Sequence, residues 1–599
     1  MTNADKILTG RSLVGGSAQG ELLFADVGLS FWGGVNSLTG DVIDQHHPLA
    51  GKNLAGRVLA IPSGRGSCTG SSVMMELISS GHAPAALILA EVDEILTLGV
   101  LLAEMIYERS IPVISIGKEA FESLRGSYYA RVSDESVRTL SSLPLDDFAP
   151  SKPNGTLDFS AYSIVLSDED RKMLAGDQGK AAQVAMQVVL KMADLQGAGE
   201  LINVTQAHID GCIYTGPASL KFAEQFVEWG AKVVVPTTLN SISVDQRRWK
   251  TLGVDPAFGE PASAVGSAYM AMGARMSYTC APYLLESAPK AGEQIVWAES
   301  NAVVYANSVL AARTLKYPDY LDICIAITGR APLSGCHLDE HRKPQLKIQV
   351  ALPDELDDAF YPLLGYHVGL LAGKRIPLVF GLEGAAPTLD NLKAFSAAFG
   401  TTSGAPLFHI AGVTPEALDL DKSGFLDSGL EQLTIALVDL VQSWNSLNSA
   451  REARVDIVTL GNPHFSLTEF KTLAELCKGL AKAPDTAMVI TCGRAIYEQA
   501  IQNGYIAEIE RFGAQIVNDT CWCMLGEPVI PPTAKNVMTN SAKFAHYAPG
   551  LVGRPVHFAS LAGCVEAASK GRTEGAYPAW LRSLDNACAT LTGLSIRSL

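Results

Sequence analysis

Short runs of β-branched and aliphatic residues alternate with stretches of helical periodicity along most of this chain. In the glycine-rich first 140 residues, helical spacing occurs near Val73–Ser80 and Leu98–Arg109, between short strand-like runs. This mixture predicts a compact β/α barrel-like domain over residues 1–140. Its expected strands are Arg11–Ala25, Arg57–Ile61, Ala85–Leu89, Ile111–Ile116 and Tyr128–Val132.

A second, much larger region is expected at residues 157–599, after a Pro- and Gly-containing linker at 141–156. Ser167–Asp170 is predicted to cap its first helix. Strand-like runs then recur, each followed by a helical pattern, which is typical of parallel sheets covered by helices. The fold class is therefore α/β, with two or three lobes in the large region. Expected strands are Glu200–Val204, Lys232–Pro236, Ile323–Thr328, Gln345–Leu352, Pro377–Phe380, Val455–Leu460 and Ala487–Thr491.

The most distinctive stretch is Ser63–Ser72, which places three glycines and five hydroxyl residues between a predicted strand and a predicted helix. The free N–H groups and the dipole at such a junction attract an anion such as a carboxylate. On composition alone, a capping turn without chemistry is an equally good interpretation.

Composition narrows the class of protein. A length of 599 residues suggests three or four domains, and 48% hydrophobic with 18% charged residues is typical of a globular enzyme. The 46 basic and 62 acidic residues give a formal charge of −16, which disfavours nucleic acid as a partner. The first ten residues do not resemble a signal peptide, and charges interrupt the longer apolar tracts. We therefore expect a cytoplasmic protein without a membrane span.

Eleven cysteines in such a chain are better explained as buried side chains and a few metal ligands than as disulfides. No CxxC motif occurs, so a metal site has to be assembled from distant segments. Several small polar stretches follow predicted strands, where open α/β sheets bind ligands. They are His208–Gly216, Pro236–Ser241, Glu299–Ala302, Thr328–Arg330, Gly461–His464, Asn518–Cys521 and Thr539–Tyr547.

Four stretches of the chain resemble the large catalytic segment of the aconitase X family: Gly273–Tyr283, Trp297–Ser308, Ile327–Arg330 and Thr539–Gly550. The first domain, with Gly64–Ser72, resembles the small swivel domain of that family. The resemblance covers nearly the whole chain, and the order of the two parts in one polypeptide resembles the fused bacterial type. That type implies dehydration of cis-3-hydroxy-L-proline, whereas the archaeal two-subunit type implies mevalonate 5-phosphate.

The resemblance also implies an iron–sulfur cluster held by three cysteines, with one iron left open to act as a Lewis acid. Cys280, Cys521 and Cys564 are the expected ligands, and Cys523 and Cys492 are the competitors. Related large subunits often have Gly-Cys-Pro-His where this chain has Gly461-Asn-Pro-His464. The missing cysteine favours a 2Fe-2S cluster, with 3Fe-4S and 4Fe-4S as alternatives.

By the same resemblance, a swivel-domain serine takes the proton, and Ser71 is the expected base, assisted by neighbouring N–H groups, Arg65 or Lys543. The partner is a small carboxylate, and the fused chain is compatible with a monomer. A metal-free lyase or binding protein and a non-catalytic iron–sulfur sensor remain as alternatives. The expected substrate-binding residues are Arg65, Ser67, Thr69, Ser72, His208, Asn240, Ser300, Asn301 and Lys543.

Overall fold

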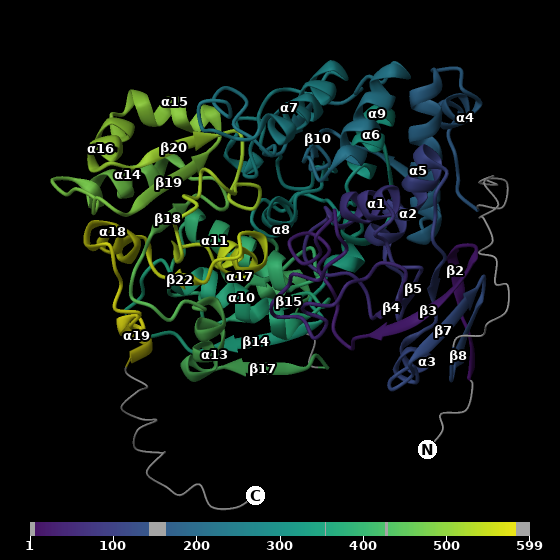
Figure 1. Ribbon diagram of the computed structural model, residues 1–599, viewed down its shortest axis with the longest axis horizontal. Coiled ribbons are helices and arrows are strands. Elements are labelled where there is room, and N and C mark those ends of the chain that lie inside the picture. The colour runs from purple at the N-terminus through teal and green to yellow at the C-terminus, as the bar shows by residue number, and fades with distance from the viewer. Residues whose placement is uncertain (1–5, 143–162, 354, 426–428, 583–599) are drawn as a thin grey trace, which may run out of the picture.

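The computed structural model describes residues 6–142, 163–353, 355–425 and 429–582, and shows an N-terminal sheet domain beside three α/β lobes (Figure 1). All but the first two residues of the expected linker at 141–156 lie outside these ranges. In Figure 1 the N-terminal domain is at the lower right, the first lobe at the upper centre and upper right, the second below the centre and the third on the left.

The N-terminal domain is one eight-stranded sheet in the order β1-β8-β7-β3-β4-β5-β6-β2. Its centre, β3 to β6, is parallel, and the remaining pairs are antiparallel. Because the consecutive strands β1 and β2 are at opposite ends of this order, the sheet curves into the predicted barrel-like shape. The elements are β1 Ile7–Thr9, β2 Arg11–Val14, β3 Ser17–Phe24, β4 Val58–Ile61, α1 Gly70–Ser80, β5 Ala86–Leu89, α2 Glu94–Tyr107, β6 Val113–Ser115, α3 Lys118–Glu122, β7 Tyr129–Ser133 and β8 Ser136–Leu140.

The first lobe contains a short parallel sheet, β11-β10-β12, surrounded by helices, and Ser167 and Asp170 form the predicted capping box. Its elements are α4 Asp168–Ala175, α5 Lys180–Leu195, β9 Leu201–Asn203, β10 Ala207–Ile209, α6 Pro217–Glu228, β11 Thr237–Leu239, α7 Pro256–Ala271, β12 Val296–Trp297, α8 Ser300–Ser308, α9 Leu321–Thr328 and β13 Arg330–Pro332.

Two strands predicted for this lobe are wrong. Ile323–Thr328 belongs to helix α9, whose eight residues are all buried, and an apolar run buried on every side does not distinguish a strand from a helix. Lys232–Pro236 has no strand, and β11 begins one residue after it.

The second and third lobes are parallel sheets in the orders β16-β15-β14-β17 and β20-β19-β18-β21-β22. The second lobe has β14 Leu346–Val350, α10 Phe360–Ala372, β15 Pro377–Phe380, α11 Leu389–Thr402, β16 His409–Ile410, α12 Leu420–Ser423, β17 Gln432–Ile435 and α13 Leu437–Leu447. The third has β18 Ile457–Leu460, α14 Leu467–Cys477, β19 Ala487–Cys492, α15 Arg494–Gln502, α16 Tyr505–Phe512, β20 Gln515–Asn518, β21 Val537–Thr539, α17 Ala542–Leu551, β22 Val556–Phe558, α18 Leu561–Lys570 and α19 Ala579–Arg582.

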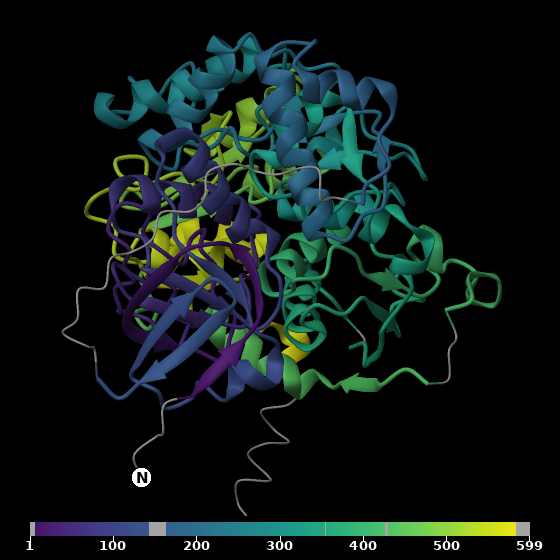
Figure 2. The same ribbon diagram turned by 90° about the vertical axis from the view of Figure 1, so that its right-hand side faces the viewer.

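Helix α1 forms the main contact between the N-terminal domain and the first lobe. In the view of Figure 2 the first lobe lies above the N-terminal domain. Ser72 Oγ is hydrogen-bonded to Thr215 Oγ1 and to Tyr320 OH, each at 2.7 Å. Glu76 Oε2 accepts the backbone N–H of Ala218 at 2.7 Å, at the start of α6. These buried contacts hold the start of α1, and the turn before it, against the large region.

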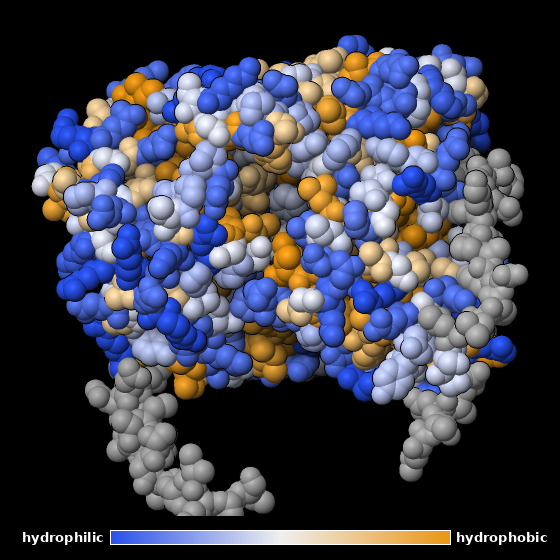
Figure 3. Space-filling view, viewed as in Figure 1, coloured by the Kyte–Doolittle hydropathy of each residue, from blue (hydrophilic) through white to orange (hydrophobic). Residues whose placement is uncertain are grey.

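Polar and apolar residues are interspersed over the face of the molecule shown in Figure 3, which is hollowed near its middle. Within the described ranges, every helix is too short or too polar to span a bilayer.

Candidate active site

Three cysteines from two distant segments meet in the interior. Cys280, Cys521 and Cys523 are each at most 6% exposed and pack together. Asn462 Nδ2 donates to the sulfur of Cys521 at 3.4 Å and to that of Cys523 at 3.2 Å. The backbone N–H of His464 donates to the Cys280 sulfur at 3.3 Å. We call Cys280, Cys521 and Cys523 the cysteine group.

The expected ligand Cys564 does not belong to this group. It lies on α18 in the apolar core of the third lobe, where Cys492 is also found. Helix packing directs the Cys564 side chain into that core, so the structure brings together only two of the three expected ligands. Cys523, the main competitor, is the third member of the cysteine group.

The side chains of the cysteine group are of the kind that holds an iron–sulfur cluster. Such clusters are bound by cysteine thiolates, and hydrogen bonds to the sulfur atoms set their reduction potential. Asn462 and the N–H of His464 are donors of this kind. In the described part of the chain, no three His, Cys, Asp or Glu side chains form a group that could hold one metal ion. A cluster differs in this respect, since its thiolates bind more than one iron.

A buried ion pair lies beside the cysteine group. Lys543 Nζ donates to Glu299 Oε1 at 2.6 Å, and Glu299 also caps α8 by accepting the N–H of Ala302 at 2.9 Å. Burial alone would lower the pKa of Lys543, but Glu299 and the nearby thiols outweigh it, so this pKa is raised. Asn301 Nδ2 donates to the Cys280 carbonyl at 2.9 Å and so connects α8 to the cysteine group.

A second acidic cluster lies under the Ser63–Ser72 turn. Asp210 follows β10 and accepts hydrogen bonds from Asn240 Nδ2 and, at 3.2 Å, from Thr69 Oγ1. Ser67 Oγ donates to Thr69 Oγ1 at 3.0 Å. Asp319 is a neighbour of Asp210, and both oxygens of its carboxyl are buried without a hydrogen-bond partner among the described residues. The turn is thus in direct polar contact with the large region.

Burial raises the pKa of the carboxyl groups in this cluster. Desolvation, followed by the charges of Glu299 and Asp322, raises the pKa of Asp210 to about 7. Burial and the neighbouring carboxylates also raise the pKa of Asp319. Asp322 accepts backbone N–H groups of Asp210 at 2.7 Å and of Ile323 at 2.7 Å, which partly offset its burial and leave its pKa at about 6.

Lys316 is a cation that the sequence did not single out. Its Nζ donates to the backbone carbonyls of Ser403 at 2.7 Å and Gly66 at 3.5 Å, and it forms no salt bridge to a carboxylate of the described residues. With Gly66, Ser67 and Lys374 it lines a cavity of about 120 Å³, which we call the turn pocket. Lys316 keeps some accessible surface there, yet surrounding protein removes enough solvent to lower its pKa to about 8.

Four other expected site residues have different partners. Ser71 Oγ donates to the Ile95 carbonyl at 2.8 Å, inside the N-terminal domain. Arg65 forms an ion pair with Asp44 at 2.7 Å. Ser72 connects the domains, as described above. His208 is fully buried, and its Nδ1 bonds to Thr238.

These positions bear on the predicted roles. To act as a base, Ser71 would first have to release the Ile95 carbonyl, so its role stays a prediction. Burial lowers the pKa of His208 to about 3, which leaves the imidazole neutral. Ser300 is buried at the first position of α8, beside Asn301.

Sequence reasoning did not single out Asp210, Glu299, Lys316 and Asp319 as candidate site residues, and it named Cys523 only as a competitor. Asp210 and Glu299 belong to polar stretches that the sequence analysis identified. Their position after predicted strands could therefore have marked them as candidate site residues. Lys316 and Asp319 belong to Lys316-Tyr-Pro-Asp319, which carries no motif. They can be recognised only in the structure, where the Ser63–Ser72 turn packs against the segment that contains them.

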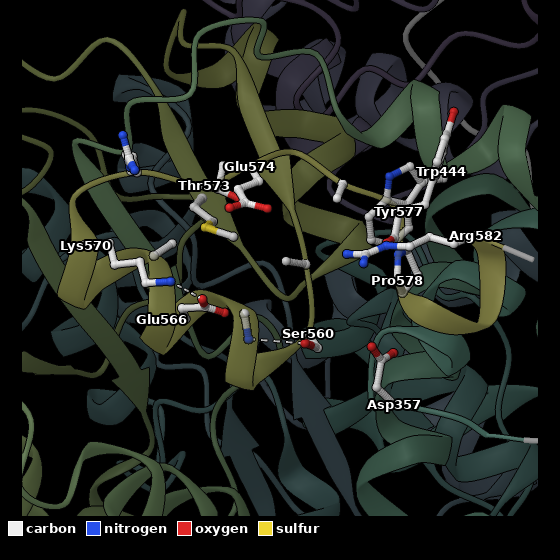
Figure 4. Close-up of a pocket in the computed structure, with 16 residues that line it drawn as sticks. Asp357, Trp444, Ser560, Glu566, Lys570, Thr573, Glu574, Tyr577, Pro578 and Arg582 are labelled. Atoms are coloured by element: carbon white, nitrogen blue, oxygen red, sulfur yellow. Dashed lines mark hydrogen bonds and ion pairs between the residues drawn. The ribbon is translucent and has the colours of Figure 1, made fainter. Parts of the chain in front are cut away.

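A separate pocket of about 270 Å³ lies at the edge of the third lobe, beside α13, α18 and α19 (Figure 4). Glu566 and Lys570 on its wall form an ion pair with each other, and Arg582 donates to the Tyr577 carbonyl. It shares no lining residue with the turn pocket or the cysteine group. Its charged side chains are mixed in sign, so we do not place the chemistry there.

The arrangement is that of an aconitase-like α/β protein, with a small barrel-like domain docked on a three-lobed region. Models of the aconitase X first, second and third domains match residues 163–340, 344–445 and 455–570, and the model of its swivel domain matches residues 7–140. The chain belongs to the aconitase X family.

Individual relatives support this assignment. A Pseudomonas aeruginosa protein named cis-3-hydroxy-L-proline dehydratase is 54% identical over 575 residues, covering 96% of this chain and 98% of that protein. The phosphomevalonate dehydratase large subunit of Methanocaldococcus jannaschii is 34% identical and matches 68% of this chain over its entire length. The crystal structure of Thermococcus kodakaraensis aconitase X in its holo-form has a TM-score of 0.62 and 33% identity, covering 68% of this chain and 100% of that one.

Proposed function

We propose that this protein is a hydro-lyase that removes water from cis-3-hydroxy-L-proline, and that the enamine product tautomerises to Δ1-pyrroline-2-carboxylate. The observation that carries the choice of substrate is the 54% identity with the Pseudomonas protein over nearly the full length of both chains. The phosphomevalonate dehydratase large subunit, in contrast, is only 34% identical.

We further propose that Cys280, Cys521 and Cys523 hold an iron–sulfur cluster. When bound, the cluster supplies a Lewis-acidic iron that weakens the C3–hydroxyl bond of the substrate. The presence of Asn462 where related chains have cysteine favours a 2Fe-2S cluster over the 3Fe-4S and 4Fe-4S alternatives. Iron and sulfide content, with the electron paramagnetic resonance spectrum, distinguishes the three.

Lys316 is the residue that we propose to bind the substrate carboxylate. Its ammonium contacts backbone carbonyls and no carboxylate of the described residues, so an anionic ligand in the turn pocket would supply the missing counter-ion. Arg65, which was expected to do this, is already paired with Asp44. Lys543 is likewise paired with Glu299.

The stereochemistry of the substrate sets a requirement on the protein. In cis-3-hydroxy-L-proline the hydroxyl and the carboxylate share one ring face, so the C2 hydrogen lies on the other. Elimination is therefore anti, and the groups that assist the hydroxyl and take the proton have to face opposite sides of the ring. The cysteine group in the large region and the turn of the N-terminal domain provide two such separate sides.

Dehydration of mevalonate 5-phosphate is the second candidate. A phosphate dianion needs several unpaired cations. The one arginine of the turn is paired with Asp44, which disfavours this substrate. A non-catalytic iron–sulfur sensor that binds nucleic acid is disfavoured by the formal charge of −16. Because one chain includes both the swivel and the large region, we propose a monomer, which light scattering tests.

Full-length protein purified without oxygen tests the proposal. It should be coloured and should dehydrate cis-3-hydroxy-L-proline, but not trans-3-hydroxy-L-proline, in which the C2 hydrogen and the hydroxyl are on the same ring face. Mevalonate 5-phosphate should not react. Turnover of mevalonate 5-phosphate and not of cis-3-hydroxy-L-proline would favour the second candidate function. A colourless protein with full activity would rule out the iron–sulfur cluster.

A further inference from the structure

Two short segments that lead to the cysteine group have the same local form. Tyr278–Cys280 in the first lobe and Asp519–Cys521 in the third each end on a threonine followed by a proposed cluster ligand. Tyr278 and Asp519, the first residues of these segments, have φ values of 39° and 67°. Such backbone is uncommon outside glycine and persists only where surrounding contacts enforce it. We call Tyr278–Cys280 and Asp519–Cys521 the cysteine turns.

One side chain, that of Arg494 at the first position of α15, contacts both cysteine turns. Its Nε and Nη2 donate to the two carboxylate oxygens of Asp519, each at 2.6 Å. The same guanidinium lies over the ring of Tyr278, with Cζ 5.9 Å from the ring centre. Its Nη1 donates to the sulfur of Met276 at 2.9 Å, just before the first of the two turns. A single arginine thus joins the first residues of both turns.

The carboxylate of Asp519 is held firmly in this arrangement. Its side chain is fully buried, whereas that of Arg494 is 22% exposed. Asp519 also accepts the backbone N–H of Gln246 at 3.1 Å, and its carbonyl accepts the N–H of Ile242 at 2.8 Å; both donors belong to the first lobe. A buried carboxylate without partners is costly, so the contact with the forked guanidinium is strongly favoured.

His464 forms a second bridge between the cysteine turns, one residue nearer the cysteines. Its Nδ1 is hydrogen-bonded to Thr279 Oγ1 at 3.1 Å, and its Nε2 to the Thr520 carbonyl at 2.8 Å. Because a carbonyl only accepts, Nε2 carries the ring hydrogen and Nδ1 accepts from Thr279. The two turns are therefore already in contact at their middle residues, and Arg494 fixes their outer ends.

We propose that Arg494 is a positioning residue for the iron–sulfur cluster, which holds the two cysteine turns at the separation that Cys280 and Cys521 need to bind iron together. The inference rests on the proposed function, in which these cysteines are ligands. The turns come from different lobes, and both residues of positive φ share one guanidinium. The hydrogen bonds of Arg494 go to Asp519 and Met276 rather than to a cysteine sulfur, so they form whether or not iron is bound.

The experiment compares the full-length parent with Arg494→Lys. Lysine keeps the positive charge, so Asp519 retains an ionic partner. It has neither the fork that satisfies both carboxylate oxygens nor a planar group for the Tyr278 ring. An effect of this variant therefore reports the loss of geometry and not the exposure of a buried, unpaired charge.

Arg330→Lys is the matched control. Arg330 forms the same forked pair with Asp170, at 2.9 and 3.1 Å, and its side chain is 16% exposed beside a fully buried carboxylate. Its other hydrogen bonds go to Asn203 and to the Leu201 carbonyl, on β9 of the first lobe. The control thus applies the same substitution to a pair of similar geometry and burial that does not contact the cysteine turns.

Two measurements are made on each protein. The first is the rate at which protein purified without oxygen releases iron to a chelator, together with the visible circular dichroism spectrum of the cluster. The second uses iron-free protein and follows the alkylation of Cys280 and Cys521 by mass spectrometry. Cys564, buried in the apolar core of the third lobe, is the internal reference for this reaction.

For Arg494→Lys we expect iron release and the alkylation of Cys280 and Cys521 to be about tenfold faster or more, because partners of ligand residues contribute about 10- to 100-fold to metal affinity. The circular dichroism spectrum should change, and Cys564 should react as in the parent. Arg330→Lys should match the parent throughout. Rates for Arg494→Lys within about twofold of the parent overturn the proposal, and so does an equal increase in Arg330→Lys.

Failure of the proposed function gives a different result. If the parent binds no iron but Arg494→Lys still accelerates alkylation of Cys280 and Cys521, Arg494 holds the two turns and the cluster is wrong. If the parent binds iron and dehydrates cis-3-hydroxy-L-proline but both rates are unchanged in Arg494→Lys, the proposed function stands and the positioning role is wrong.

Discussion

The assignment of Lys316 as the carboxylate-binding residue leads to a quantitative prediction. Lys316→Met keeps the length of the side chain and removes its charge. A hydrogen bond to a charged group contributes ~1.5–3 kcal/mol, and we take ~2 kcal/mol because Lys316 is partly accessible in the turn pocket. That corresponds to a loss of about 30-fold in kcat/KM. The loss should be mainly in KM, because the carboxylate is held both before and during the reaction.

The pH dependence gives a second signature of the same residue. Burial lowers the pKa of Lys316 to about 8, so about nine-tenths of it is protonated at pH 7 and about one-tenth at pH 9. The kcat/KM of the parent should therefore fall about tenfold between these pH values. Unfolding does not cause this fall. Between pH 8 and the ordinary lysine pKa of 10.5, Lys316 binds more protons in the unfolded chain than in the folded one. The titration of Lys316 therefore makes the free energy of unfolding rise with pH.

The assay is kcat/KM from pH 6 to pH 9.5 for the parent, Lys316→Met and Lys374→Met. Lys374 is the matched control, because it lines the same pocket but is paired at 2.6 Å with Glu91 on the surface. We expect the control to follow the parent and Lys316→Met to lose the alkaline fall. An alkaline fall of the same size in Lys316→Met would refute the reasoning, since some other group would then be titrating.

Three further predictions concern the cluster, Ser71 and the domains. Cys523→Ser should abolish visible absorbance and activity, whereas Cys564→Ser should keep full iron; the reverse result would restore the original ligand set. Ser71→Ala should cost ~1 kcal/mol in thermal unfolding through the lost bond to Ile95. Loss of exchange of the substrate C2 hydrogen with solvent in this variant would make Ser71 the base, and exchange at the parent rate would exclude it. Residues 157–599 alone should hold iron without turning over, and adding residues 1–140 should restore part of the activity; appreciable turnover by the large piece alone would place the proton-accepting group elsewhere.

The expected cysteine ligands illustrate the limits of motif context. Cys280 and Cys521 were identified from the family-like stretches around them, and the structure places both in the cysteine group. Cys564 has a similar context but faces an apolar core. Which side of a helix or turn meets another segment depends on how the lobes pack, and that is not written in neighbouring residues.

The sequence by itself determined the larger features. Alternating strand and helix periodicity indicated parallel α/β lobes, and the glycines and hydroxyls of Ser63–Ser72 indicated a binding turn, because both signals are local along the chain. Tertiary structure alone decided which residues act together. Lys316 and Asp319 come from a stretch without a motif, and they join the site only because the N-terminal domain docks on the first lobe. Docking removes solvent, and desolvation turns an ordinary lysine and an ordinary carboxyl into groups with shifted pKa values.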